Sequence, residues 1–378
     1  MMPAMRLLYG VVGDGMGHAT RSRVVIGHLL GHGHAVHVVA SDRAFGFLRD
    51  AFEGRPGFEA TEIAGLRMIY RDNKVRKGAT AAVTLFEAPR SIRRNRDAWM
   101  RITAGKVPDA VITDFDSFAA LLGRHFGIPV ISIDNNHAID RLRHPRGMLR
   151  GALVDFAIAK AVVQARYPHA YHYLVASFFF PPPSKLGTTL VPPILRPEIL
   201  AARREPGRHV LVYQTASTNR GLVPALRKLP HEFRVYGMGR DGTEGNVTLR
   251  AFSEKGFVDD LRTARAVVAG GGFSLLSEAV HLRVPVLSIP LRGQFEQELN
   301  ARWIERLGYG ERAREITPEA VEAFLGRVDE HAAALASYVP RDNTTLFACV
   351  DELLARAARG EPRPKTLAAA PVTPASSR

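Results

Sequence analysis

The segment GDGMGHATRS, residues 13–22, follows the apolar run RLLYGVV and combines glycines with an aspartate, a histidine and an arginine. Glycines allow a tight turn, so we expect His18 at the start of a helix, where its imidazole can reach a substrate. A histidine in such a place can remove a proton as a general base, and Asp14 is a second candidate for this role. Two other interpretations stay open, a helix cap made by His18 and a dinucleotide site with Asp42 on the ribose. The dinucleotide site is the weaker one, because His18 stands where the G-x-G-x-x-G pattern requires its third glycine.

The segment VITDFDSFAALLG places two carboxylates, Asp114 and Asp116, between a buried strand and a helix. A D-x-D pair can hold a divalent cation that carries a nucleotide diphosphate. Alternatively, Asp114 orients His18 and stabilises its protonated form, while Asp116 caps the helix. The sequence alone does not bring His18 and Asp114 together, so both interpretations stay open.

Four histidines, His28, His32, His34 and His37, lie close together in GHLLGHGHAVH. We expect them to span a helix end, a turn and the start of a strand, so that their rings diverge and hold no metal ion. The single cysteine, Cys349, lies in the apolar helical stretch TTLFACVDELL, which predicts a core thiol and excludes a disulfide framework. No metal site and no cofactor are predicted.

The segment RAVVAGGGFSLLSEAV predicts a strand that ends in Gly270, Gly271 and Gly272 and passes directly into a helix. Backbone N–H groups exposed by the glycines, together with the positive end of the helix dipole, would bind a diphosphate without a metal ion. Glu278 follows Ser274 by four residues, so it lies on the same helix face and can accept hydrogen bonds from a ribose diol. A plain tight connection between strand and helix is the alternative.

The next segment, PLRGQFEQELN, places Gln294, Glu296 and Gln297 between a strand end and a helix. Clustered amide and carboxylate groups suit a polyol such as a hexose. Otherwise they are ordinary polar residues of a first helical turn.

Short β-branched runs alternate with longer amphipathic segments on both sides of a proline-rich stretch. Residues 178–206 contain 7 of the 24 prolines, which are excluded from the interior of helices and central strands. Strands are expected in RLLYGVV, AVHVVAS, DAVITDF and PVISIDN of the first half and in HVLVYQT, FRVYGM, RAVVAGG and PVLSIP of the second. The alternation predicts an α/β fold of two facing Rossmann-like doubly wound domains. We place the domains at 1–180 and 207–358, with a linker at 181–206 and a disordered tail at 359–378.

The formal net charge of +14 is concentrated in part of the chain, since residues 67–106 hold 11 Lys and Arg against 3 Asp and Glu. A local excess suits an anionic membrane surface or an anionic substrate, and no RNP-like or zinc-finger pattern supports nucleic-acid binding. A solvated arginine-rich helix face is the alternative. Because no signal-peptide or membrane-spanning run is found, we expect a cytoplasmic protein with peripheral contact to the inner face of the membrane through 67–106.

Together these segments resemble the GT-B glycosyltransferases over most of residues 5–355. They are most similar to the branch that contains the peptidoglycan lipid-I N-acetylglucosaminyltransferase, the UDP-glycosyltransferases and related bacterial family 1 proteins. FVDDLRTARAVVAGGGFSLLSE resembles the donor-site signature of that branch, in which an F-[IV]-D-D loop precedes the phosphate-binding strand. EQELNA resembles its acidic-or-Gln, Gln, x, x, Asn, Ala motif, and GMGHATR its N-domain Gly-His turn.

The resemblance implies that the N-terminal domain binds the acceptor, with His18 as the base and Asp114 as its partner carboxylate. It implies that the C-terminal domain binds the nucleotide sugar. The implied contacts are to the nucleobase from Phe257 and Val258, to the diphosphate from Gly271, Gly272, Phe273 and Ser274, to the ribose from Glu278, and to the sugar from Glu296 and Gln297.

The chain departs from the family pattern in two places. Plant-type members have a histidine where this chain has Gly270, so phosphate contacts must come from the backbone or from Thr215, Ser217 and Thr218 of QTASTN. The GHATRS form is also similar to nucleotide-sugar hydrolases of the same fold. We predict a metal-independent, inverting glycosyltransferase that moves a hexose-type sugar from a UDP-sugar to a lipid-linked or anionic acceptor hydroxyl. A nucleotide-sugar hydrolase or epimerase is the alternative.

Overall fold

The structure is a computed structural model that describes residues 3–13, 15–65, 70–71, 74–75, 77–166, 169–214 and 221–368. The contacts within the chain divide it into two units. Unit 1 consists of Met1–Met68, Lys77–Ile194 and Asp342–Arg378, and unit 2 consists of Ile69–Arg76 and Leu195–Arg341. Each unit is built around its own parallel sheet.

The sheet of unit 1 has the strand order β3-β2-β1-β6-β7-β8-β9, and its pairings are parallel. The strands are β1 (Arg6–Val11), β2 (Ala35–Ala40), β3 (Phe58–Glu62), β6 (Ala110–Asp114), β7 (Val130–Asp134), β8 (His172–Ala176) and β9 (Thr188–Val191). Every residue of β6 and β7 is buried, as expected for strands with helices on both faces. Val11 at the end of β1 lies opposite Asp114 at the end of β6, so the segments that follow these two strands begin side by side.

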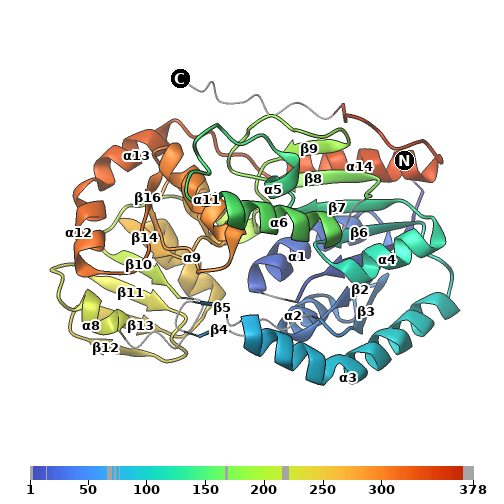
Figure 1. The fold of residues 1–378 in the computed structure, drawn as a ribbon, viewed down its shortest axis with the longest axis horizontal. Coiled ribbons are helices and arrows are strands. Elements are labelled where there is room, and N and C mark those ends of the chain that lie inside the picture. The colour runs from blue at the N-terminus through green and yellow to red at the C-terminus, as the bar shows by residue number, and fades with distance from the viewer. Residues whose placement is uncertain are drawn as a thin grey trace. The chain divides into compact units, whose positions relative to one another are not determined.

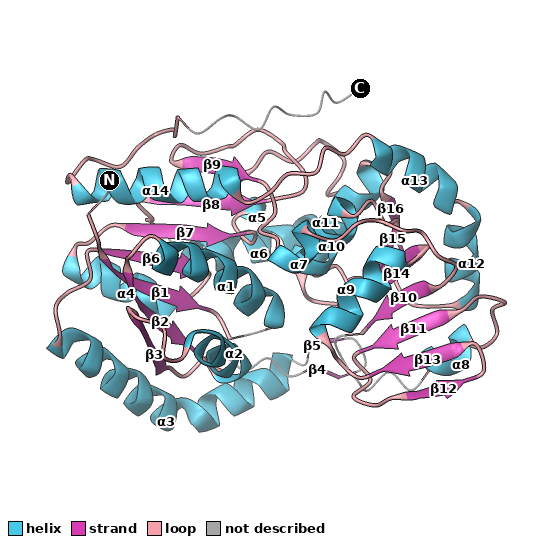
Figure 2. Ribbon diagram, turned by 180° about the vertical axis from the view of Figure 1, so that it is seen from behind, coloured by secondary structure: helices cyan, strands magenta, loops and turns pink. Residues whose placement is uncertain are grey.

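Helices cover both faces of this sheet. They are α1 (Met16–Gly31), α2 (Asp42–Phe52), α3 (Lys77–Ala104), α4 (Ser117–Phe126), α5 (Ala138–Arg141), α6 (Leu153–Arg166) and α14 (Thr344–Ala358). Figure 1 shows α4 and α6 in front of the sheet, whereas Figure 2 shows α1, α2 and α14 on the opposite face. Ile102 of α3 and Leu122 of α4 pack with Leu8 and Val111 of the sheet in one apolar cluster.

The sheet of unit 2 has the order β12-β13-β11-β10-β14-β15-β16, with parallel pairings except for the β12–β13 pair. The strands are β10 (Val210–Tyr213), β11 (Phe233–Tyr236), β12 (Gly242–Glu244), β13 (Val247–Arg250), β14 (Ala266–Ala269), β15 (Val286–Ser288) and β16 (Gly310–Arg312). The helices are α7 (Pro197–Leu200), α8 (Leu222–Leu226), α9 (Glu254–Thr263), α10 (Phe273–His281), α11 (Phe295–Arg306), α12 (Pro318–Gly326) and α13 (Val328–Ala336). The short strands β4 (Tyr70–Arg71) and β5 (Lys74–Val75) form a separate antiparallel pair. Leu226 of α8 and Phe324 of α12 pack against Val212 and Phe233 of the main sheet.

All eight strands expected from the sequence are present, and the predicted α/β fold class is confirmed. The unit boundaries differ from the expected ones. The chain passes from unit 1 to unit 2 between Ile194 and Leu195, inside the expected linker, but the same stretch also contains strand β9. Helix α14 belongs to unit 1, whereas the sequence places residues 344–358 in the second domain.

Helix α14 and the residues after it pack on unit 1. Cys349 is fully buried in α14, as predicted, and burial raises the pKa of its thiol to about 12. The Tyr171 hydroxyl donates to the carbonyl of Glu361 at 3.0 Å, and the N–H of Gly187 donates to the carbonyl of Lys365 at 2.9 Å. These bonds order residues that the sequence places in a disordered tail. Within the described part of the chain, no helix is both long and apolar enough to cross a bilayer.

Candidate active site

The residues that follow β1 place His18 at the beginning of α1. Gly15 precedes the helix with a φ of 93°, a conformation that glycine adopts without strain. The side chain of His18 keeps 18% of its surface exposed, so its ring is accessible to a substrate. The helix-cap interpretation of His18 is wrong, because Gly15 is the N-cap residue and the imidazole instead bonds Asp114.

Asp114 is the centre of a hydrogen-bond network in unit 1. Its Oδ1 atom lies 2.9 Å from Nδ1 of His18. Arg21, one turn further along α1, donates to both carboxylate oxygens, at 2.6 and 2.7 Å. Ser22 donates to Oδ2 at 3.2 Å, and Arg21 also donates to the amide oxygen of Asn135. The network therefore joins the ends of three neighbouring strands, β1, β6 and β7.

This environment keeps the Asp114 carboxylate ionised. Burial alone would raise its pKa, but the charges and hydrogen bonds of Arg21 and His18 outweigh burial and lower the pKa. Nδ1 of His18 lies 2.9 Å from Asp114 and 2.7 Å from Nη2 of Arg21, so the tautomer decides which of them it bonds. With its hydrogen on Nδ1, His18 donates to Asp114 and presents the lone pair of Nε2, which is the form that a general base requires.

Asp116 is held by a different element. Its side chain accepts a hydrogen bond from the N–H of Ala119 at 2.8 Å and so caps α4, which confirms that interpretation. Burial raises the pKa of Asp116 to about 6. Because residues of α1 bond the oxygens of Asp114 while Asp116 caps α4, the arrangement does not favour a D-x-D cation site.

Two of the four clustered histidines diverge as predicted. His34 is buried and accepts a backbone hydrogen bond at 3.1 Å, and His37 bonds a threonine of β3 at 2.9 Å. His28 and His32 do not diverge, since their ring centroids lie 4.2 Å apart. For this pair the prediction is wrong, because a spacing of four residues places both rings on one face of α1.

The glycine turn that follows β14 is held in place by α11. A Cβ atom on Gly271 would lie 2.3 Å from the backbone oxygen of Gln297, so no larger residue fits there. The side-chain oxygen of Gln297 accepts from the N–H groups of Gly271 and Leu291, at 3.2 and 3.0 Å. Asn300 donates to the carbonyl of Gly271 at 2.9 Å. These bonds fix the shape of the turn, and Gly272 leads directly into α10.

The polar residues that begin α11 also bond one another. Gln297 donates to Gln294 at 2.5 Å, and Asn300 donates to Glu296 at 2.6 Å. Gln297 is 8% exposed, so in this arrangement its amide braces the glycine turn. Phe273 and Ser274 are the first residues of α10, and Phe273 is buried.

Glu278 lies on the second turn of α10 and pairs with a buried arginine near the start of unit 2. Arg196 donates to its two carboxylate oxygens, at 2.8 and 2.9 Å, and to Glu254 at 3.2 Å. Burial alone would lower the pKa of Arg196, but the carboxylates of Glu278 and Glu254 raise it. Glu278, the predicted ribose contact, therefore forms an ion pair with Arg196 in this structure.

Phe257 and Val258 lie in helix α9, and the expectation of a loop at this segment is wrong. Both side chains are buried, because Phe257, Val258 and Leu261 form one apolar face of that helix. The ring of Phe257 lies edge-on to Tyr236, with centroids 5.1 Å apart. The ring centroid of Phe252 lies 6.3 Å from that of Phe257. Because Phe252 is 69% exposed, its ring is accessible from the solvent.

Several predicted residues lie outside the described residues: Asp14, Thr215, Ser217 and Thr218. Parts of the basic segment 67–106 also lie outside them. Of the arginines described there, Arg93, Arg94 and Arg96 are exposed on α3, and Arg94 forms an ion pair with Glu62.

Comparison with known proteins decides the family. Residues 5–329 match the model of glycosyl transferase family 1. The chain belongs to this family. The glycosyltransferase is 25% identical over 352 residues to an uncharacterized glycosyltransferase of Methanosarcina acetivorans, an alignment that covers 86% of this chain and 88% of the relative. A relative from Methanosarcina mazei is also 25% identical, over 355 residues that cover 84% of this chain and 88% of the other.

Solved structures confirm the GT-B fold of the glycosyltransferase. The calicheamicin glycosyltransferase CalG4 matches with a TM-score of 0.60 at 18% identity and covers 94% of this chain and 100% of its own. LpCGTa in complex with UDP matches with a TM-score of 0.64 at 15% identity, with coverage of 94% and 100%. The kitacinnamycin glycosyltransferase matches with a TM-score of 0.61 at 18% identity, with coverage of 93% and 99%.

Sequence analysis alone misses some residues that shape the Asp114 network and the glycine turn of this glycosyltransferase. Arg21 follows His18 by three residues, and this spacing was a usable signal for a shared helix face. Asn300 lies in the EQELNA motif and could have been assigned to the glycine turn. Asn135 and Arg196 carried no such signal, because their partners are distant in the sequence.

Proposed function

We propose that this glycosyltransferase moves a hexose from a UDP-sugar to an acceptor hydroxyl, by direct displacement with inversion and without a metal ion. The observation that carries the proposal is the hydrogen bond between His18 and the buried Asp114 in a chain of glycosyl transferase family 1. Unit 1 supplies the base that activates the acceptor, and unit 2 binds the donor.

The base step follows from the hydrogen bonding of His18. Nδ1–H donates to Asp114, and the lone pair of Nε2 takes the proton of the acceptor hydroxyl. The acceptor oxygen forms a bond to the anomeric carbon while the bond from that carbon to the diphosphate oxygen breaks, and the nucleotide leaves with the electron pair. Asp114 stabilises the imidazolium that forms, and Arg21 holds the carboxylate in position. Attack from the face opposite the leaving group inverts the anomeric carbon.

The donor proposal rests on the beginning of α10. The N–H groups of Gly272, Phe273 and Ser274 and the positive end of the helix dipole would stabilise the departing diphosphate, so no cation is required. Gly271 contributes the tight turn, since its own N–H donates to Gln297. Glu278 and its partner Arg196 offer an acceptor and a donor to a ribose diol. Gln294 and Glu296 offer polar groups to the sugar hydroxyls, with Gln297 holding the turn behind them.

The nucleobase would lie against the aromatic cluster of α9. Phe252 supplies an exposed ring for stacking, and Phe257 and Val258 support it from the helix. UDP is the favoured nucleotide because the sequence resembles UDP-sugar enzymes and because the similar structure of LpCGTa was solved in complex with UDP.

The acceptor is proposed to be lipid-linked or otherwise anionic. The exposed arginines of α3 support this, because a basic helix face attracts anionic headgroups. Co-sedimentation with vesicles of anionic phospholipid tests it, with neutral phosphatidylcholine vesicles as control. Wild type should sediment with the anionic vesicles, and a variant with alanine at Arg93, Arg94 and Arg96 should lose this binding. Unchanged sedimentation of the triple variant would remove the support for a membrane-bound acceptor.

Calorimetric titration in EDTA tests the donor site. UDP should bind more tightly than ADP or NAD, and Glu278→Gln should weaken UDP by at least about tenfold, since a hydrogen bond to a charged group contributes about 1.5–3 kcal/mol. Glu298→Gln is the matched control, because Glu298 also pairs with arginine, Arg302, at 2.6 Å on α11. Preferential NAD binding, or equal effects of the two substitutions, would contradict the proposed donor site.

A further inference from the structure

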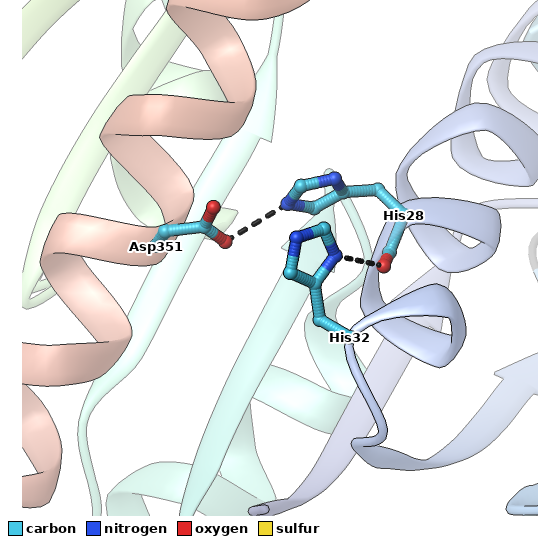
Figure 3. A group of neighbouring side chains, drawn as sticks. All are labelled: His28, His32 and Asp351. Atoms are coloured by element: carbon cyan, nitrogen blue, oxygen red, sulfur yellow. Dashed lines mark hydrogen bonds and ion pairs between the residues drawn. The ribbon is translucent and has the colours of Figure 1, made fainter. Parts of the chain in front are cut away.

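A cluster of possible metal ligands joins α1 to α14 within unit 1. His28 and His32 of α1 and Asp351 of α14 each offer one ligand atom, and these atoms lie within 4.8 Å of one another (Figure 3). Nε2 of His28 lies 2.9 Å from Oδ1 of Asp351. The ligand types, two imidazoles and one carboxylate, are those that Zn²⁺ accepts.

The hydrogen bond of His32 prepares its ring for a cation. Nδ1 of His32 lies 2.9 Å from the backbone carbonyl oxygen of His28, and because a carbonyl can only accept, Nδ1 carries the hydrogen. The neutral ring therefore has its lone pair on Nε2. That nitrogen lies on the side of the ring that faces Asp351 (Figure 3). A histidine that ligates a metal commonly donates its other N–H to a carbonyl in this way, which fixes the tautomer and the ring orientation.

The ring of His28 is fixed by packing. It stacks on Phe347 of α14, with ring centroids 4.0 Å apart and planes inclined by 3°. His28 is 9% exposed, whereas Asp351 is 36% exposed. The cluster thus has a buried side, which orients the ligands, and an open side, through which an ion and a water ligand can enter.

We propose that His28, His32 and Asp351 bind a divalent transition-metal ion of the Zn²⁺ class, with water as the fourth ligand. Ligand bonds of 2.0–2.2 Å in a tetrahedral site place neighbouring ligand atoms about 3.3 Å apart. The distance from His28 to Asp351 is already close to this value. His32 lies at the open side, and its ligand atom, within 4.8 Å of the other two, supplies the third ligand.

The ion would fasten α14 to α1, elements that are 323 residues apart at His28 and Asp351. His18 precedes His28 by ten residues on the same helix, which corresponds to about 15 Å along its axis. The metal is therefore proposed to stabilise unit 1, and it is separate from the proposed base. A plain hydrogen bond between His28 and Asp351 is the competing explanation, and it gives His32 no role.

Titration of the metal-free, tag-free full chain with Zn²⁺ by calorimetry distinguishes the two explanations. One ion should bind per chain, and His32→Ala and Asp351→Asn should each lower the affinity for Zn²⁺ by at least about tenfold. Replacing a residue that only supports a metal ligand already lowers the affinity by about 10- to 100-fold, and these two residues are proposed as ligands themselves. Asn at position 351 keeps an acceptor for His28 while it removes the charge. His231→Ala is the matched control, because His231 forms an exposed pair with Glu322, at 3.1 Å, and should leave Zn²⁺ binding unchanged.

Thermal unfolding gives an independent readout. Excess Zn²⁺ should raise the unfolding temperature of wild type and of His231→Ala by about 3 °C or more, and should not raise that of His32→Ala. Without metal, His32→Ala should unfold only slightly below the wild-type temperature, because it loses one exposed hydrogen bond to the carbonyl of His28. A small difference of this kind shows that the loss of Zn²⁺ binding does not come from misfolding. Wild type that binds no Zn²⁺, or His32→Ala that binds it as tightly as wild type, would overturn the proposal. Neither result depends on donor binding or sugar transfer.

Discussion

Replacing Asp114 by Asn should separate two roles of one carboxylate. Asn keeps the shape of the side chain but removes its charge, which stabilises protonated His18 and fixes the His18 tautomer. In an enzyme that uses a base and a carboxylate in this way, such a loss lowers kcat by about 10³- to 10⁴-fold. It also removes the carboxylate that pairs with Arg21, a side chain that is only 4% exposed and keeps its bond to Asn135. Breaking a buried ion pair from one side costs about 3–5 kcal/mol, so the free energy of unfolding should fall by a similar amount.

Three variants measured together test this reasoning. His18→Ala should lose activity to a comparable degree but little stability, because the pair between Asp114 and Arg21 remains. Ser22→Ala removes a 3.2 Å bond to Asp114 and a side-chain bond to the buried Tyr9, but it removes no charge. Activity should therefore stay near wild type, and stability should fall by about 1–3 kcal/mol. Activity is measured as UDP release from a UDP-hexose, and stability by denaturant unfolding. Asp114→Asn with activity within tenfold of wild type, or with wild-type stability, would refute the assignment of Asp114.

Further predictions concern the cap of α4 and the glycine turn. Burial raises the pKa of Asp116 from about 3.8 to about 6, so the folded state holds a proton that the unfolded state loses, and stability should decrease as pH rises from about 4 to about 6. Asp116→Asn keeps a good cap and should remove this loss, which amounts to about 2 kcal/mol between pH 4.5 and pH 7.5 in unfolding experiments. An equal difference in stability between the two proteins at both pH values would contradict the prediction. Gly271→Ala should weaken UDP at least about tenfold in calorimetry, since its Cβ would lie 2.3 Å from the backbone oxygen of Gln297. Gly272→Ala, where a Cβ meets nothing within 4 Å, is the control, and equal affinity of the two variants would rule out the steric argument.

The sequence predicted the sheets better than the boundaries of the units. The eight runs rich in β-branched residues all form strands, because strands buried on both faces must be continuously apolar. Strand β9 lies at an edge of its sheet, where the proline-rich composition around it is tolerated, and composition alone therefore suggested a linker. The amphipathic pattern of α14 predicted a helix but could not show which unit buries its apolar face.

The site was predictable in its parts but not in its connections. The residue types around His18 and Asp114 suggested a base and its partner, whereas their contact depends on β1 and β6 being neighbours with Val11 opposite Asp114. Sequence spacing does not specify such a register. The same applies to His28 and His32, whose spacing of four residues indicates a shared face, while Asp351 comes from the other end of the chain.

The most direct test of the central claim compares chemistry and donor binding in His18→Ala. UDP release from a panel of UDP-hexoses, with and without hydroxyl acceptors, is measured in EDTA alongside calorimetric binding of UDP. The account predicts acceptor-dependent release that falls by at least about 10² in His18→Ala, with UDP affinity within about twofold of wild type. Release that is unchanged by the substitution, or that proceeds at the same rate without any acceptor, would contradict it.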